Sequence, residues 1–284
     1  MASVIHELQL DDLRAWLKPR AVNAHKGDFG SVGVLGGASG MVGAALLAGR
    51  SALWTGAGRV FVGMIDTRLA VDSVVPELML CEPARVFALD PPACLAVGPG
   101  LGQSKPAEQL LTEALRSSLP LVLDADALNL IARDPVLQDQ LRERAPGQTV
   151  LTPHPAEAAR LLGCATEAVQ SDRVAAVENL VQRFACVVVL KGAGSLILAP
   201  GAALLRNSTG NAGMASAGMG DVLTGLLAAQ VAQGLSLLQA TQFAVYLHGA
   251  AADAAVASGI GPIGLTASEV AQHARHCLNR WISS

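Results

Sequence analysis

Short apolar runs alternate with helical patterns along most of this chain of 284 residues. Each apolar run is bounded by turn-forming residues and is too short for a buried helix, so the runs predict strands. Continuous apolar strands that are separated by helices are typical of a parallel sheet with both faces covered. We therefore expect a three-layer α/β/α fold with a mainly parallel central sheet. The expected strands are Ser31–Leu35, Arg59–Met64, Leu95–Gly98, Leu121–Asp124, Thr149–Leu151, Cys186–Leu190 and Ser195–Leu198.

The segments between these strands predict helices, and the last third of the chain is mostly helical. Residues 203–206 follow a turn at Pro200-Gly201 and predict a hairpin strand near the edge of the sheet. Because no repeat, low-complexity segment or linker divides the chain, we expect one domain over residues 1–284, with residues 1–25 as an N-terminal extension. The expected helices are Val42–Thr55, Pro106–Arg116, Pro155–Leu162, Thr166–Phe184, Asp221–Gln233, Ser236–Ala257 and Thr266–Trp281.

Charge and composition argue against several kinds of partner. The formal net charge of −3 gives no support for binding to nucleic acid or to an anionic membrane surface. Residues 222–252 contain no Asp, Glu, Lys or Arg, but Gln230, Gln233 and Gly234 interrupt them, so they predict two buried helices rather than a membrane span. The first residues lack a secretory signal, and the five cysteines contain no CxxC pair. These features predict a cytoplasmic protein with reduced thiols.

A glycine-rich turn at residues 211–220 leads straight into an apolar helical segment. Glycines let successive backbone N–H groups point at one spot, and a helix N-terminus adds partial positive charge, so this turn predicts a phosphate site. Asp221 is out of place beside a phosphate unless its carboxylate takes the proton of a substrate hydroxyl during phosphate transfer. The alternative is an ordinary loop in which Asp221 caps the helix.

Further loops rich in Gly, Pro and Asp follow other expected strands. Ligands of parallel sheets bind beyond the carboxyl ends of the strands, so we expect these loops and Asp221 to gather on one rim. Lys191 can reach a phosphate as a point charge, and the alternative is a solvated lysine in a glycine-rich hairpin turn. The loops are Gly36–Gly40, Gly98–Gly102, Asp124–Asp126, Thr152–Glu157 and Lys191–Ser195.

Some ionisable residues in these loops fit two interpretations. Pro155 suits the first turn of a helix, so His154 either caps that helix or touches a substrate. Glu157 either favours the positive N-terminus of the helix or holds Mg²⁺ through water. We expect Asp124 and Asp126 to cap the helix that follows them, and the alternative is that they are outer acids of the site.

Taken together, these motifs resemble those of the NAD(P)H-hydrate dehydratases, which are ribokinase-like proteins. The resemblance runs from about Lys26 to the C-terminus, with the motifs in the family's order. The Thr-Pro-His-Pro and Asp-Ala-Asp-Ala-Leu-Asn strings point to the dehydratases, whereas Gly-x-Gly-Asp is shared with ribokinase-like kinases. The motifs are Lys26–Gly30, Gly36-Gly37 with Gly43-Ala44, Gly98–Gly102, Asp124–Asn129, Leu151–Pro155 with Glu157, Leu190–Ala193 and Gly218–Asp221.

The resemblance implies ADP- or ATP-dependent dehydration of the S-form of the hydrate NAD(P)HX back to NAD(P)H. The nucleotide phosphorylates the ring hydroxyl, and phosphate then leaves to restore the double bond. Asp221 is the implied catalytic base, and Mg²⁺ is implied near Glu157. The anion hole is implied at Gly218, Met219 and Gly220. The hydrate is expected against Ala44, Gly102, His154 and Asp221. The nucleotide is expected against Lys191, Gly192, Ala193, Gly194, Ser195 and Gly220.

The sequence departs from the family pattern at two points. Met219 stands where a small residue is usual, which removes a side-chain hydroxyl but keeps the backbone amide, so phosphate binding should survive. Residues 1–25 leave no room for the epimerase domain that many relatives carry, so we expect a separate epimerase. Relatives form tetramers, and a homo-oligomer is therefore expected. The alternatives are a ribokinase-like kinase of a vitamin or sugar, and a nucleotide-binding regulatory protein without catalysis.

Overall fold

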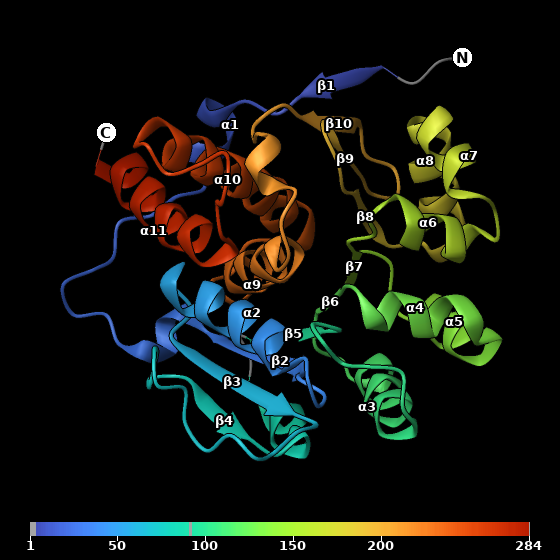
Figure 1. The fold of residues 1–284 in the computed structure, drawn as a ribbon, viewed down its shortest axis with the longest axis horizontal. Helices are drawn as coiled ribbons and strands as arrows, with labels where there is room; N and C mark the ends of the chain where they lie inside the picture. The colour runs from blue at the N-terminus through green and yellow to red at the C-terminus, as the bar shows by residue number, and fades with distance from the viewer. Residues whose placement is uncertain (1–3, 91–92, 284) are drawn as a thin grey trace.

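A mainly parallel sheet forms the centre of the molecule in a computed structural model that describes residues 4–90 and 93–283 (Figure 1). Within these residues the sheet has ten strands in the order β1-β10-β9-β8-β7-β6-β5-β2-β3-β4, and β9 alone runs antiparallel to its neighbours. The strands are β1 Ile5–Glu7, β2 Ser31–Gly36, β3 Arg59–Met64, β4 Met79–Cys81, β5 Ala93–Val97, β6 Leu121–Leu123, β7 Thr149–Leu151, β8 Val187–Leu190, β9 Ser195–Leu198 and β10 Leu204–Asn207.

Helices cover both faces of this sheet, so the expected three-layer fold is confirmed. In Figure 1, α2, α9, α10 and α11 lie on one face, and α3 to α8 lie on the other. The helices are α1 Leu10–Arg14, α2 Val42–Trp54, α3 Lys105–Arg116, α4 Asp126–Arg133, α5 Pro135–Arg142, α6 Pro155–Leu162, α7 Thr166–Ser171, α8 Arg173–Phe184, α9 Met219–Ala232, α10 Leu237–Ala257 and α11 Ala267–Ser283. Three 3₁₀ turns add η1 Lys26–Phe29, η2 Pro83–Ala88 and η3 Ala212–Met214.

The apolar runs of the strands divide between the two layers of helices. In β6, Val122 packs into the core under α9 and α10, whereas Leu121 and Leu123 pack into the core under α3 to α8. Successive side chains of a strand point to opposite faces, so a strand that is buried on both faces needs an uninterrupted apolar run. This is why the central strands could be predicted so closely.

The structure differs from the sequence prediction mainly at short elements. The three-residue strands β1 and β4 were not expected, because they lie towards the sheet edges and have little apolar pattern; β1 adds part of the expected N-terminal extension to the sheet. The expected helix Thr166–Phe184 is two helices, since Asp172 ends α7 and its side chain accepts a hydrogen bond from the Ala175 N–H at 2.9 Å, which caps α8.

The uncharged stretch 222–252 forms α9 and most of α10, with Gly234 in the connecting turn at a φ of 99°. The predicted division into two helices is therefore confirmed. Across residues 4–90 and 93–283, none of the helices is both long and apolar enough to cross a lipid bilayer.

Candidate active site

The loops that follow the parallel strands meet on one rim, as expected, and hydrogen bonds tie them together. The Ala38 N–H donates to the Gly100 carbonyl at 2.7 Å, which joins the loops after β2 and β5. The Lys191 N–H donates to the Pro153 carbonyl at 2.9 Å, which joins the loops after β8 and β7. The rim is therefore a connected surface on which residues distant in sequence face one another.

The N-terminus of α9 lies at this rim and has the geometry of an anion site. Gly218 precedes the helix with a φ of 87°, and a Cβ there would stand 2.6 Å from Leu47, so only glycine fits. The first N–H groups of α9, from Met219, Gly220 and Asp221, have no partner within the helix. The Met219 side chain is buried in the core, so its apolar character serves packing while its backbone N–H stays at the helix end.

Lys191 and Asp124 form a largely buried ion pair beside this helix end. The Lys191 Nζ lies 2.6 Å from Asp124 Oδ1 and 3.8 Å from Glu157 Oε2, and the Asp124 side chain is 2 % exposed. Thr224 of α9 donates its hydroxyl to Asp124 Oδ2 at 3.0 Å. A Cβ on Gly220 would stand 3.2 Å from both Asp124 Oδ2 and Lys191 Nζ, so the backbone of Gly220 closely approaches the pair.

These contacts decide the charges of the pair. Burial by itself raises the pKa of Asp124, but the charge of Lys191 and hydrogen bonds from its neighbours outweigh burial, so the pKa is lowered. Burial acts to lower the pKa of Lys191, and the carboxylates of Asp124 and Glu157 raise it on balance. Both residues are therefore ionised at neutral pH. The alternative of a solvated lysine in a turn is half right: residues 191–194 do form a glycine-rich hairpin turn between β8 and β9, but Lys191 is paired with Asp124 rather than solvated.

The expectation that Asp124 and Asp126 cap the following helix is also wrong. Ala125 occupies the cap position of α4 with a φ of 49°, and no side chain caps this helix. Asp124 turns inward to Lys191 instead, and Asp126 Oδ2 accepts a hydrogen bond from the Gly102 N–H at 2.8 Å. Asp126 thus holds the Gly102 loop against the rim. This role agrees better with the alternative, in which the two aspartates are outer acids of the site.

Asp221 lies in the first turn of α9, and its carboxyl group has a raised pKa. Burial is the main cause that raises its pKa from an ordinary 3.8 to about 7, and the negative charges of Asp124, Asp126 and Glu157 add to it, while Lys191 opposes them. A carboxylate with a pKa near neutral is a much better proton acceptor than an ordinary aspartate. No side-chain cap bond is present at this helix end, so the capping alternative has no support.

His154 and Glu157 form a reciprocal cap at the start of α6. His154 Nδ1 accepts from the Ala156 N–H at 3.1 Å, and Glu157 Oε2 accepts from the His154 N–H at 2.8 Å. Because Nδ1 is an acceptor, the proton of the neutral ring is on Nε2, which lies 3.2 Å from Glu157 Oε1. Burial, with the nearby charge of Lys191, lowers the pKa of His154, so this neutral form persists at pH 7. Capping is therefore confirmed, and substrate contact stays a prediction.

Two substitutions of His154 separate these roles. His154→Asn keeps a good capping residue but removes the imidazole, whereas His154→Ala removes both. We expect the alanine variant alone to lose about 1 kcal/mol of stability, and both variants to show a raised KM for the hydrate. Thermal unfolding and steady-state kinetics measure the two effects. A normal KM in the asparagine variant would limit His154 to capping.

The expected nucleotide loop, Lys191–Ser195, connects β8 to β9 and ends on the first residue of β9. It is braced by Arg173, which was not predicted as a site residue. Arg173, at the start of α8, donates to the carbonyls of Leu190 at 3.1 Å and Gly194 at 3.3 Å. Gly192 has a φ of 139°, and a Cβ there would meet the Arg173 guanidinium at 2.4 Å. No local pattern marks Arg173, because its partners lie on a different element.

The remaining expected site residues also lie on the rim. Ala44 is half-buried in the first turn of α2, close to Gly100 in the loop after β5, and Gly102 belongs to the same loop. Glu157 is buried, and within the described part of the chain no three His, Cys, Asp or Glu side chains are grouped to hold a metal ion. Mg²⁺ binding near Glu157 therefore stays a proposal.

The family model for NAD(P)H-hydrate dehydratase matches residues 32–274. The chain belongs to this family. It is 42 % identical to an ADP-dependent (S)-NAD(P)H-hydrate dehydratase from Neisseria meningitidis, over 93 % of this chain and 90 % of that protein. It is also 42 % identical to a bifunctional NAD(P)H-hydrate repair enzyme from Coxiella burnetii, over 93 % of this chain and 53 % of that protein. The chain thus spans about half the length of this bifunctional relative.

Solved structures agree with this membership. An ADP/ATP-dependent NAD(P)H-hydrate dehydratase from Bacillus subtilis, co-crystallised with ATP and Mg²⁺, superposes with a TM-score of 0.84 at 29 % identity, over 98 % of this chain and 99 % of that one. A ribokinase-like protein from Enterococcus faecalis superposes with a TM-score of 0.86 at 24 % identity, over 99 % and 97 %. The predicted dehydratase family and ribokinase-like fold are both confirmed.

Proposed function

We propose that this protein dehydrates the S-form of NAD(P)HX to NAD(P)H and uses ADP or ATP to do so. The observation that carries the proposal is Asp221. In a member of the dehydratase family, this carboxyl group has a pKa of about 7 and lies at the helix end where the Gly220 backbone meets Lys191. A proton acceptor beside a phosphate site is what phosphorylation of a hydroxyl requires.

The reaction divides into a phosphoryl transfer and an elimination. Asp221 takes the proton of the ring hydroxyl while the hydroxyl oxygen attacks the terminal phosphorus of the nucleotide, whose bond to the leaving oxygen breaks. The N–H groups at the start of α9 receive the charge on the transferring phosphoryl group. Phosphate then leaves with the electrons of the C–O bond, assisted by the ring nitrogen, and loss of a proton from the neighbouring carbon restores the double bond.

The nucleotide is assigned to Lys191–Ser195 and Gly220. The loop carries two glycines with positive φ, Gly192 and Gly194, and Lys191 offers a charge that can pass from Asp124 to a phosphate. The hydrate is assigned to the part of the rim around Ala44, Gly102, His154 and Asp221, where hydrogen bonds join the loops.

Magnesium fits the chemistry of this rim. Carboxylate oxygens are the ligands that Mg²⁺ prefers, and the ion usually keeps several waters and takes one or two carboxylates with substrate phosphates. Glu157, whose pKa is raised chiefly by burial, would hold the ion through water, because its oxygens are already engaged by His154 and Lys191. When bound, Mg²⁺ neutralises charge on the phosphates. We further propose a homotetrameric, cytoplasmic enzyme that works with an NAD(P)HX epimerase.

The test supplies purified NADHX with ADP, with ATP, or with no nucleotide. We expect the near-ultraviolet absorbance of reduced nicotinamide to return only when nucleotide is present, with one phosphate released for each NADH formed. A stable phosphorylated product without NADH would instead identify a ribokinase-like kinase. Recovery that is equally fast without nucleotide would contradict the role of the phosphate site.

A further inference from the structure

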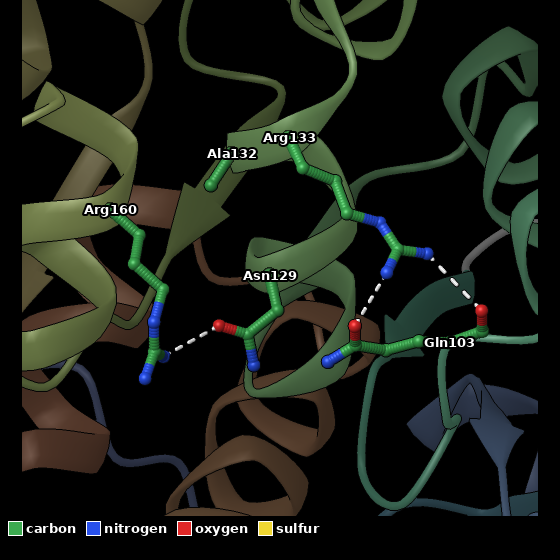
Figure 2. A pocket seen from close by; sticks show the side chains of 5 residues that line it. All are labelled: Gln103, Asn129, Ala132, Arg133 and Arg160. Carbon is green, nitrogen blue, oxygen red and sulfur yellow. Dashed lines mark hydrogen bonds between the residues drawn. The ribbon is translucent and has the colours of Figure 1, made fainter.

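A pocket that carries two arginines opens next to the active-site rim. It has a volume of about 480 Å³ and lies between α4, α6 and the loop after β5 (Figure 2). Figure 2 shows the two guanidinium groups on opposite sides of the Asn129 side chain. Its lining is Gln103, Asn129, Ala132, Arg133 and Arg160. Asn129 ends one of the family motifs, but none of the five was predicted as a site residue.

The pocket lies close to the proposed hydrate site. Asn129 lies three residues beyond Asp126 on α4, and Arg160 lies three residues beyond Glu157 on α6. Residues with this spacing share a helix face and stand about 4.5 Å apart along the axis, and helical side chains lean towards the N-terminus. Since α4 packs against α6, one turn of each helix separates the pocket from the rim. Gln103 directly follows Gly102, which completes the connection.

The two arginines differ in whether a carboxylate neutralises their charge. Arg133 donates to the Gln103 side chain at 2.6 Å and to the Glu108 carboxylate at 3.1 Å, so its charge is partly neutralised. Arg160 donates to the neutral amide oxygen of Asn129 at 2.8 Å. Among the ion pairs of the described residues, none joins Arg160 to a carboxylate. Arg160 therefore keeps an available positive charge at the mouth of the pocket.

The hydrogen bond to Asn129 also orients the Arg160 guanidinium so that both side chains can donate to an anion. An arginine can only donate, so the oxygen of the Asn129 amide must face Arg160, and the amide nitrogen remains as a neighbouring donor. The charge of Arg160 also reaches the rim, where it is one of the causes that act to lower the pKa of both His154 and Glu157. A fixed guanidinium next to an amide donor suits bidentate binding of phosphate oxygens.

We propose that this pocket holds the diphosphate bridge of the dinucleotide hydrate, with Arg160 as the residue that positions it. The inference rests on the proposed function, because it assumes that the reacting ring lies between Gly102, His154 and Asp221. The helix end at Gly220 and the Lys191 loop are assigned to the transferring phosphoryl group and its nucleotide. The hydrate's own phosphates therefore need a separate cationic site, and the pocket beside Gly102 supplies one.

The decisive variant is Arg160→Gln, compared with Arg160→Lys, which keeps the charge, and with Arg116→Gln as a matched control. Arg116 is an exposed arginine at the C-terminal end of α3, just before the chain enters the N-terminal end of β6, which is the end of that strand away from the rim. We expect Arg160→Gln to raise the KM for NADHX and for NADPHX equally, by roughly 10- to 100-fold, with kcat nearly unchanged. The lysine variant should lose less, and the control nothing.

Other patterns would overturn the assignment. A rise in KM for NADPHX alone would place the 2′-phosphate in the pocket, and a rise in KM for ADP would give the pocket to the nucleotide. Unchanged KM values for both hydrates would exclude a positioning role for Arg160.

A direct titration keeps this result separate from the proposed reaction. NADH carries the same diphosphate bridge and needs no turnover, so its Kd in calorimetry should rise in Arg160→Gln by the same factor as the KM. If the wild-type protein binds NADH in this way but does not dehydrate NADHX, the proposed function fails and the pocket assignment stands. If Arg160→Gln binds NADH as tightly as the wild type, the pocket assignment fails whatever the activity.

Discussion

The variant Asp221→Asn is expected to lower kcat for NADHX by about 10²- to 10⁴-fold, which is the usual contribution of a general base. Asparagine keeps the shape and much of the hydrogen bonding of aspartate but cannot accept the hydroxyl proton. Removal of a negative charge beside the phosphate site should leave the Kd for ADP equal or lower, because a repulsion is relieved. Steady-state kinetics with NADHX and calorimetric titration with ADP measure the two effects.

The pH dependence of the wild-type enzyme provides a control for this assignment. A base works in its ionised form, so with a pKa of about 7 for Asp221, the rate should rise as the pH increases through 7 and level off above it. The slow residual reaction of Asp221→Asn should lack this rise. Turnover near the wild-type rate would falsify the proposed mechanism while leaving the fold intact.

Lys191→Met is expected to damage both folding and nucleotide binding. The change leaves Asp124 buried without its counter-ion, and removal of one partner of a buried pair typically costs about 3–5 kcal/mol. The Kd for ADP should rise by roughly 10- to 100-fold, because a charge-assisted contact to phosphate is lost. The Kd for NADH should change little. Denaturant unfolding and titration with each ligand measure these changes.

The double variant Asp124→Asn/Lys191→Met separates the two effects. Asparagine is neutral and can still accept the hydrogen bond from Thr224, so most of the lost stability should return. The affinity for ADP should stay low, since the cation is still absent. If ADP binding recovered together with stability, Lys191 would be a structural residue and its place in the nucleotide site would be lost.

Much of the fold could be predicted because strands that are buried on both faces need uninterrupted apolar runs, which can be recognised in the sequence. The expected β3, β7 and β9 have the observed bounds, and the other central strands differ only at their ends. The short strands β1 and β4 were missed because three-residue strands towards the sheet edges depend on their neighbours more than on their own pattern. The two aspartates at the start of α4 were misread for a related reason: capping is the common local role of aspartate, and a tertiary partner overrode it.

The sequence by itself determined the layered parallel sheet, the loops on its rim, the glycine-rich helix end before Asp221 and the family. Each is carried by apolar runs or short motifs whose residues lie within a few positions of one another. The tertiary structure decided the pairing of Lys191 with Asp124, which are 67 positions apart, and the raised pKa of Asp221. It also decided the pocket around Arg160. Burial and charge–charge distances set these properties. Both follow from the order of the strands in the sheet, which places β6, β7 and β8 side by side and brings Asp124 and Lys191 together against Gly220 at the start of α9.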